Sequence, residues 1–408
     1  MTVDTPFRVE RSFLARCLSL LGRAVRPLVR KIVYRNPHAL VMWTFLGPLV
    51  SSSVYSLVKL GVIDDLKTNG PKTTKDLADA AIVDEDSLYR ILRALASIGY
   101  LNQLADGRFE LTPVSELLLQ DHPESFHGMA TLYGDVVVSD MSNFPETLKT
   151  GTSVVELNNG GKTFWQLLEQ QPVTAGAFDR QMATWTQLHA ATVTKSYDFS
   201  SARSVVDIGG GRGTMMREIL VANPQAKGVI LDRPEVVIQT KQQMEQAGLA
   251  DRCECVGGSF FESVPEGADL YVIKHVLHDW DDQHAVQILR NVRKAMRPDS
   301  RLLIIEGLVE HDYAFGEFFR TWWDILQLSH TLGRSRTAEQ MKSMLQRTGF
   351  RLDSLKPTSL PDVLILEIRP VPIDFEDEAP EKADEPLAES TLVRATDEPG
   401  SSAQWTPE

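Results

Sequence analysis

The run Val205-Val206-Asp207-Ile208-Gly209-Gly210-Gly211-Arg212-Gly213 decides the fold, because an apolar strand ends there in a cluster of glycines. Glycine lets the backbone turn sharply and lets a ligand approach the main chain closely. The next apolar run, 228–232, ends in Asp232, nineteen residues after Gly213. A carboxylate at that strand end can bind both hydroxyls of a ribose. Together the two runs predict an adenosine-binding site; the alternative is a tight strand-to-helix turn in which Asp232 caps a helix.

Apolar runs alternate with helical patterns throughout residues 203–370. This alternation is typical of βαβ units, so it predicts an α/β fold with a parallel, doubly wound sheet. Helices are expected at 283–296 and 338–347, and the strands are expected at 204–208, 228–232, 252–256, 269–273, 302–306 and 363–368.

The segment Lys274–Asp282 is the densest cluster of titratable residues in the chain. It directly follows the strand at 269–273, so we expect it at the carboxyl edge of the sheet, where ligands bind in this architecture. Within it, His278 can act as a general base near neutral pH. Two alternatives remain. The segment is the capped start of a surface helix, or His275, His278 and Asp282 share one helical face and hold a metal ion.

Residues 37–200 carry mostly helical patterns. The order helix, helix and hairpin is that of a winged helix, so a ligand-sensing regulator that binds DNA is one alternative function. Five acidic residues make its helix pair acidic and repel phosphates, which argues against nucleic acid as a partner; they are Asp76, Asp79, Asp84, Glu85 and Asp86. The expected elements are a buried apolar segment at 40–66, a helix that starts at Thr73 or Thr74, a helix at 84–99, and a hairpin at 100–110 that turns at Asp106-Gly107.

Charge is spread unevenly along the 408 residues, which carry a net charge of −13. Hydrophobic residues make up 43% and charged residues 24%, as in ordinary globular proteins. Residues 371–408 are rich in acids and proline and are predicted to form an acidic disordered tail. Residues 1–36 alternate arginine with apolar residues at helical spacing. This basic amphipathic arm is expected to pack in a dimer, to contact an anionic membrane surface, or to serve as a targeting helix.

The three cysteines, Cys17, Cys253 and Cys255, include no CxxC pair, and the last two are too close in a strand to form an ordinary disulfide. This usage favours a reducing, cytoplasmic setting. No apolar run is long enough to predict a transmembrane helix. The N-terminus lacks a compact apolar run with a cleavage site, so secretion is not expected.

Several motifs resemble those of the S-adenosylmethionine-dependent small-molecule O-methyltransferases of the caffeic-acid, acetylserotonin and bacterial polyketide-tailoring type. The resemblance implies a Rossmann-like class I methyltransferase domain at 201–370 and, before it, a helical winged-helix dimerisation domain at 37–200. It also implies S-adenosyl-L-methionine as the cofactor, a small-molecule hydroxyl acceptor, and a homodimer. The motifs that carry the resemblance are Asp207–Gly213, Asp232, Gly257–Phe261, Lys274–Asp282, Leu302–Glu306 and Phe178–Met182.

The resemblance assigns five residues to the cofactor. Gly209 would approach its methionine end, and Asp232 would bind the ribose hydroxyls. Ser259 and Phe260 occupy positions that contact adenine in the family, and Lys274 occupies the position of a lysine on the cofactor side.

The resemblance also implies a catalytic pair and an acceptor pocket. His278 takes the place of the general base, and Glu306 takes the place of an acid that orients it. No metal is implied, because the sulfonium methyl is already activated. The expected pocket walls suit a flat apolar acceptor, and they are Phe178, Met182, Trp185 and Asp279, with Trp165, Trp322, Trp323 and His330 as further aromatic candidates.

Two positions depart from the family pattern. Ser259 stands where the family usually has an acid after two glycines, and Ser335 stands where a second acid orients the histidine, just before Arg336-Thr337. Some bacterial relatives bind the same cofactor and catalyse a hydroxylation or decarboxylation instead. An enzyme with such altered chemistry is therefore a further alternative.

Overall fold

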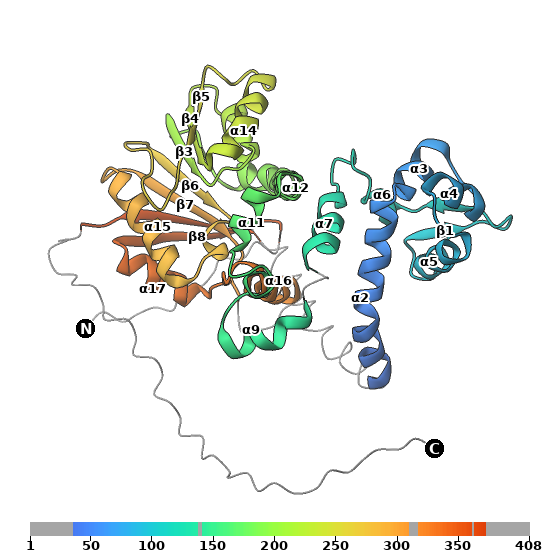
Figure 1. Cartoon of the computed structure of the whole chain (residues 1–408). Coiled ribbons are helices and arrows are strands. Elements are labelled where there is room, and N and C mark those ends of the chain that lie inside the picture. The colour runs from blue at the N-terminus through green and yellow to red at the C-terminus, as the bar shows by residue number, and fades with distance from the viewer. Residues whose placement is uncertain (1–35, 138–140, 310–316, 361–362, 373–408) are drawn as a thin grey trace, which may run out of the picture. The chain divides into compact units, whose positions relative to one another are not determined.

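The computed structural model describes residues 36–137, 141–309, 317–360 and 363–372 (Figure 1). Apart from Asn36 and residues 371–372, the basic arm predicted at 1–36 and the tail predicted at 371–408 lie outside the described residues.

The N-terminal half is helical and contains one small hairpin (Figure 1). Thr73 caps α4 by accepting the amide hydrogen of Asp76 at 3.2 Å, and Asp84 caps α5 through the amide of Ser87 at 2.8 Å. The predicted helix starts and the hairpin are confirmed, whereas the winged-helix name stays a prediction. The elements are α2 (Pro37–Lys59), α3 (Val62–Asn69), α4 (Thr74–Ala81), α5 (Glu85–Ser97), β1 (Leu101–Gln103), β2 (Phe109–Leu111), α6 (Pro113–Glu116), α7 (His127–Leu132), the π-helix η1 (Tyr133–Val137), η2 (Met141–Asn143), α9 (Phe144–Thr150), α10 (Val154–Asn158), α11 (Phe164–Gln170) and α12 (Pro172–Ser196).

The C-terminal half is built on a seven-stranded sheet in the order β5-β4-β3-β6-β7-β9-β8. The first five strands are parallel, as predicted, but β9 is antiparallel to both β7 and β8, so the prediction of an all-parallel sheet is wrong at this edge. The strands are β3 (Ser204–Ile208), β4 (Lys227–Asp232), β5 (Cys253–Gly257), β6 (Leu270–Lys274), β7 (Arg301–Glu306), β8 (Phe350–Pro357) and β9 (Leu364–Pro370); the helices are α13 (Thr214–Ala222), α14 (Pro234–Gln246), the 3₁₀ turn η3 (Leu277–Asp279), α15 (Asp282–Ala295), α16 (Glu317–His330) and α17 (Ala338–Arg347).

Strand β8 is the strand that the sequence does not predict. It lies at the edge of the sheet, and its apolar residues alternate with charged or polar residues. Asp353 on this strand forms ion pairs with Arg351 at 2.8 Å and with Arg369 of β9 at 2.9 Å. Charged residues are common on edge strands, and they interrupt the apolar pattern by which a strand is predicted.

Two apolar clusters fill the two faces of the sheet. Val206 and Ile208 of β3 belong to a cluster with α15 and α17, and Val205 belongs to a cluster with α12, α13 and α14. Alternate residues of one strand thus point to opposite faces, and both faces are covered by helices. The buried strands bring their carboxyl ends to one edge, where the candidate site lies.

The prediction that the apolar segment 40–66 is buried is wrong for the first half of that segment. The start of α2 exposes large apolar side chains, because no described element covers them. By length and composition α2 could also cross a membrane, although no such helix was expected, and 17% of its most apolar window is buried. The exposed residues are Leu40, Val41, Met42, Trp43, Phe45, Leu46 and Leu49.

Gly213→Ala tests the turn that opens α13. Gly213 has φ +76°, and an added Cβ would lie 2.8 Å from Met244 Cε and 2.9 Å from Ile230 Cδ1. Gly248 has φ +67° with nothing within 4 Å, so Gly248→Ala is a control for the backbone cost alone. We expect Gly248→Ala to lower the free energy of unfolding by about 1 kcal/mol and Gly213→Ala by about 1–3 kcal/mol more. Urea unfolding measures both, and equal losses would contradict the tight packing.

Candidate active site

The glycine turn after β3 forms one side of the site. Gly209 has φ +68°, and its N–H donates to the Leu231 carbonyl at 2.8 Å. A Cβ at this position would lie 2.7 Å from Val276 Cγ2, so only glycine fits between the strand end and the turn after β6. Gly211 N–H donates to Asp232 Oδ2 at 2.7 Å, which links the turn to the end of β4.

The five residues expected at the cofactor all lie where neighbouring parallel strands end. Gly209 follows β3, Asp232 ends β4, Ser259 and Phe260 follow β5, and Lys274 ends β6. The order β5-β4-β3-β6 makes these four strand ends adjacent. The structure therefore brings the five residues to one edge of the sheet.

The acids of this edge suit an adenosine cofactor with a charged end. The Asp232 carboxylate accepts hydrogen bonds from the backbone amides of Gly211 at 2.7 Å and Arg233 at 2.8 Å. Each carboxylate oxygen keeps a lone pair that can accept a hydrogen bond from a ribose hydroxyl. Burial raises the pKa of Asp207 to about 7, and its Oδ2 has no hydrogen-bond partner among the described residues. A buried acceptor without a donor is what a bound polar group would satisfy, so the residues fit S-adenosylmethionine.

The backbone after β6 turns sharply, which separates the residues of the titratable cluster. His275 has φ +51°, η3 spans Leu277–Asp279, and α15 begins only at Asp282, capped by Asp281. The alternative in which His275, His278 and Asp282 share one helical face is therefore wrong. Within the described ranges, no group of three or more His, Cys, Asp or Glu side chains could hold a metal ion.

His278 is buried between two acids that contact it differently. Glu306 Oε1 accepts the backbone N–H of His278 at 3.2 Å, whereas the ring Nε2 lies 3.4 Å from Asp279 Oδ1. Gln327 donates to the same Asp279 oxygen at 2.9 Å. Glu306 therefore orients the turn that carries the imidazole, and Asp279 is the acid beside the ring.

Burial sets the charge of these groups. Burial, Lys274 and Arg336 lower the pKa of His278 to about 3. Burial raises the pKa of Glu306 to about 7, and it raises the pKa of Asp279 well above its usual range with a contribution from the Glu306 charge. The His278 imidazole is thus neutral at physiological pH, and it can accept a proton.

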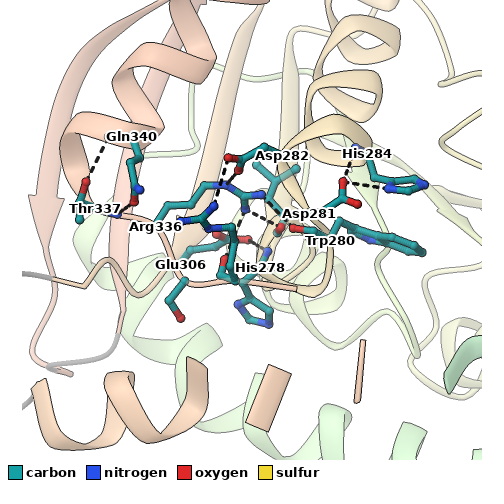
Figure 2. Close-up of polar contacts among 12 residues, drawn as sticks. His278, Trp280, Asp281, Asp282, His284, Glu306, Arg336, Thr337 and Gln340 are labelled. Atoms are coloured by element: carbon teal, nitrogen blue, oxygen red, sulfur yellow. Dashed lines mark hydrogen bonds and ion pairs between the residues drawn. The ribbon is translucent and has the colours of Figure 1, made fainter. Parts of the chain in front are cut away.

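Arg336 holds the backbone of the turn (Figure 2). It is 2% exposed, and it donates to the carbonyls of Leu277 at 2.7 Å and Trp280 at 2.8 Å and to Asp282 Oδ1 at 2.9 Å. The planar guanidinium has donors in several directions, so one side chain satisfies acceptors on both sides of His278.

Ser335, which departs from the family pattern, belongs to the segment 333–336, which packs against the turn that carries His278. Its N–H donates to Asp324 Oδ1 of α16 at 2.6 Å. Two residues earlier, a Cβ on Gly333 would lie 2.1 Å from the His278 carbonyl oxygen. The segment thus touches the His278 turn through its backbone as well as through Arg336.

A cavity of about 560 Å³, part of it open solvent, adjoins His278. Of the expected walls, Trp185 is not among its lining residues, and it packs against Trp323 with ring centroids 4.6 Å apart. Trp322 is 61% exposed and also lies outside the lining. The lining residues expected from the sequence are Phe178, Met182, His278, Asp279, Trp165, Trp323 and His330.

The sequence reasoning missed the remaining lining residues. Met129, Leu132 and Tyr133 come from α7 and η1, 32 to 36 residues before the nearest predicted wall, Trp165, and no local pattern marks them. His275 and Gln327 also line the cavity. His275 lies in the titratable cluster, which was the one available signal.

Arg336→Met tests the support of the His278 turn. The substitution leaves two buried carbonyls without their donor, so we expect the free energy of unfolding to fall by roughly 3 kcal/mol. Arg334→Met is the control, because Arg334 is exposed and contacts Asp282 only at 3.4 Å. We expect that control to lose less than about 1 kcal/mol. Urea unfolding compares the two, and equal losses would refute the role given to Arg336.

Two family models match the chain. The O-methyltransferase domain matches residues 148–351, and the O-methyltransferase dimerisation domain matches residues 42–121. The mitomycin biosynthesis 6-O-methyltransferase of Streptomyces lavendulae is 37% identical over 325 residues, which are 79% of this chain and 92% of that protein.

Solved structures agree with these matches. The structure of a mitomycin 7-O-methyltransferase is 36% identical, with a TM-score of 0.78, and the match covers 84% of this chain and all of that chain. An O-methyltransferase from neocarzinostatin biosynthesis, in complex with S-adenosylmethionine and 2-hydroxy-5-methyl naphthoic acid, is 27% identical with a TM-score of 0.70, over 79% of this chain and 96% of that chain. With a class I methyltransferase fold, a dimerisation domain and this degree of identity, the chain belongs to the S-adenosylmethionine-dependent O-methyltransferases.

Proposed function

We propose that this enzyme methylates a hydroxyl group on a flat aromatic or polyketide-like small molecule, with His278 as the general base. One observation carries the proposal: a cavity walled by aromatic side chains adjoins a buried neutral imidazole at the sheet edge that suits the cofactor. Relatives named for mitomycin biosynthesis and a relative bound to a naphthoic acid support this acceptor class.

We assign Gly209, Asp232, Ser259, Phe260 and Lys274 to cofactor binding. S-adenosylmethionine supplies an electrophilic methyl group when it is bound, so the protein has to supply an oriented, deprotonated oxygen. Asp232 would accept hydrogen bonds from the ribose hydroxyls. Ser259 would contact adenine more weakly than the acid that the family usually has at this position. The Lys274 ammonium, which donates to Thr186 Oγ1 at 3.2 Å, keeps positive charge beside Asp207.

The acceptor hydroxyl would give its proton to a ring nitrogen of His278. Asp279, whose Oδ1 lies 3.4 Å from Nε2, would position the ring as a neutral acid, since burial raises its pKa, and Glu306 would hold the turn in place. Positioning of the two reactants contributes about 7–11 kcal/mol, and a general base adds about 10²–10⁴-fold in rate. A histidine with a lowered pKa is a weak base, so phenols and enols should be better acceptors than aliphatic alcohols.

We also propose the domain boundaries 37–200 and 201–370 and a homodimer formed through the first of these domains. The exposed apolar start of α2 falls largely inside the matched dimerisation domain and supports that interface. The buried free thiols of Cys253 and Cys255 support a cytoplasmic location. Membrane contact through residues 1–36 lies outside the described residues and stays a prediction.

The alternative within the family is an enzyme that binds the same cofactor and oxidises or decarboxylates its substrate. Ser335 in place of a second acid is the observation that favours it. Incubation with labelled S-adenosylmethionine and a panel of phenols, enols and polyketides, read by mass, separates the two. A labelled, methylated product supports the proposal, and an unmethylated, hydroxylated product overturns it.

Two substitutions separate the cofactor from the acceptor. Asp232→Ala should weaken S-adenosylhomocysteine binding about tenfold or more, because two charge-assisted hydrogen bonds are lost. His278→Ala should abolish methyl transfer and leave that affinity nearly unchanged. Calorimetry measures the affinity and mass spectrometry the transfer, with His284→Ala as the control, since His284 is exposed. Wild-type transfer by His278→Ala, or unchanged affinity in Asp232→Ala, would refute the assignment.

The pH profile tests the charge of His278. A base whose pKa is lowered to about 3 stays deprotonated in mild acid, so kcat/KM for a phenol should not fall as the pH drops from 6.5 to 5. The measurement is made on Glu306→Gln at saturating S-adenosylmethionine, because Glu306 and the cofactor-side Asp207 both have a pKa raised to about 7 and would otherwise affect the profile in this range. An acid limb centred near pH 6.5 in that variant would contradict a lowered histidine pKa.

A further inference from the structure

We propose that His275 determines acceptor specificity by hydrogen bonding to a second oxygen substituent, on the ring position next to the hydroxyl that His278 deprotonates. The inference rests on the proposed function, because it assumes that an aromatic acceptor occupies the cavity. It concerns a residue that neither the family resemblance nor the comparisons assign.

The backbone of His275 is held in an uncommon conformation. Its φ of +51° lies in the left-handed region, which costs energy for residues other than glycine. Its N–H donates to the Ile305 carbonyl of β7 at 3.1 Å, which fixes the residue beside the neighbouring strand. Such strained residues cluster at functional sites, where the surrounding structure enforces them.

The side chain of His275 has an unsatisfied hydrogen-bonding atom. Its imidazole lines the cavity, and its buried Nε2 has no hydrogen-bond partner among the described residues. An unpaired buried polar atom costs roughly 1–3 kcal/mol, so the protein gains when another molecule supplies the partner. A polar substituent on an acceptor becomes such a partner when the side chains that enclose Nε2 shift as the acceptor binds.

The neighbours of His275 decide what it can bind. Its ring centroid lies 5.1 Å from that of His278 and 5.3 Å from that of His189. Burial, together with Lys274 and these two histidines, lowers the pKa of His275 well below its usual value. The ring is therefore neutral, with one N–H donor and one acceptor nitrogen. It suits a hydroxyl or carbonyl oxygen, whereas it adds no charge to recruit a carboxylate.

The distance between the two rings limits where the second substituent sits. Rings 5.1 Å apart can both reach groups on neighbouring positions of one flat acceptor. The rest of the cavity wall is largely apolar and includes Phe164, Trp165 and Trp323. Vicinal aromatic diols are therefore favoured over otherwise identical monohydroxy compounds.

The test compares naphthalene-2,3-diol with 2-naphthol, which differ in one oxygen. Dissociation constants are measured by tryptophan fluorescence with the full chain and S-adenosylhomocysteine. We expect the wild type to bind the diol roughly tenfold more tightly, the value of one hydrogen bond. In His275→Phe this ratio should fall to about one, while 2-naphthol affinity changes less than about twofold. His275→Asn should recover part of the ratio, because asparagine tolerates the left-handed conformation and keeps a donor and an acceptor.

The outcomes separate this inference from the proposed function. A wild type without the preference, a wild type that binds neither probe, or a His275→Phe variant that keeps the preference would overturn the role of His275. His284→Phe is the control for an exposed histidine and should leave the ratio unchanged. If the preference depends on His275 but the acceptor panel yields an unmethylated, hydroxylated product, the proposed function fails and the specificity role stands.

Discussion

Arg336 is the cation around which the active-site turn is organised (Figure 2). Its guanidinium fixes two carbonyls of the turn and the first acid of α15, and its charge acts on both His278 and Glu306. Within a buried site, one permanent cation lowers the pKa of nearby carboxyl groups and of nearby imidazoles. The same side chain therefore holds the shape of the turn and modifies the effect of burial, since it lowers the pKa of His278 further and counteracts the raised pKa of Glu306.

This arrangement favours orientation over base strength. In its proposed role as general base, His278 is neutral and can take a proton, but its affinity for that proton is low. An enzyme of this kind gains little on weakly acidic alcohols and much on acceptors that lose a proton readily. Precise placement in an aromatic cavity then contributes a larger share of the rate than proton abstraction does.

Much of the fold could be predicted from the sequence, because buried parallel strands are continuous apolar runs. The ends of β3 to β7 fall within about two residues of the predicted ends, and the residues that follow those strands meet at one edge. What could not be predicted depends on contacts between distant segments. The start of α2 is apolar yet exposed, Trp185 packs against Trp323 outside the cavity lining, and Glu306 binds the His278 backbone rather than its ring. Periodicity says which residues are apolar but not which element covers them.

The position of β9 between β7 and β8 has a consequence for how the protein is made. During synthesis β7 and β8 emerge before the strand that joins them, so the β7 edge stays unpaired until residue 370 has left the ribosome. That edge carries Glu306, which means that the turn around His278 is completed late. An open edge of apolar residues is a point where nascent chains associate wrongly. The catalytic half thus depends on its last strand to cover the β7 edge.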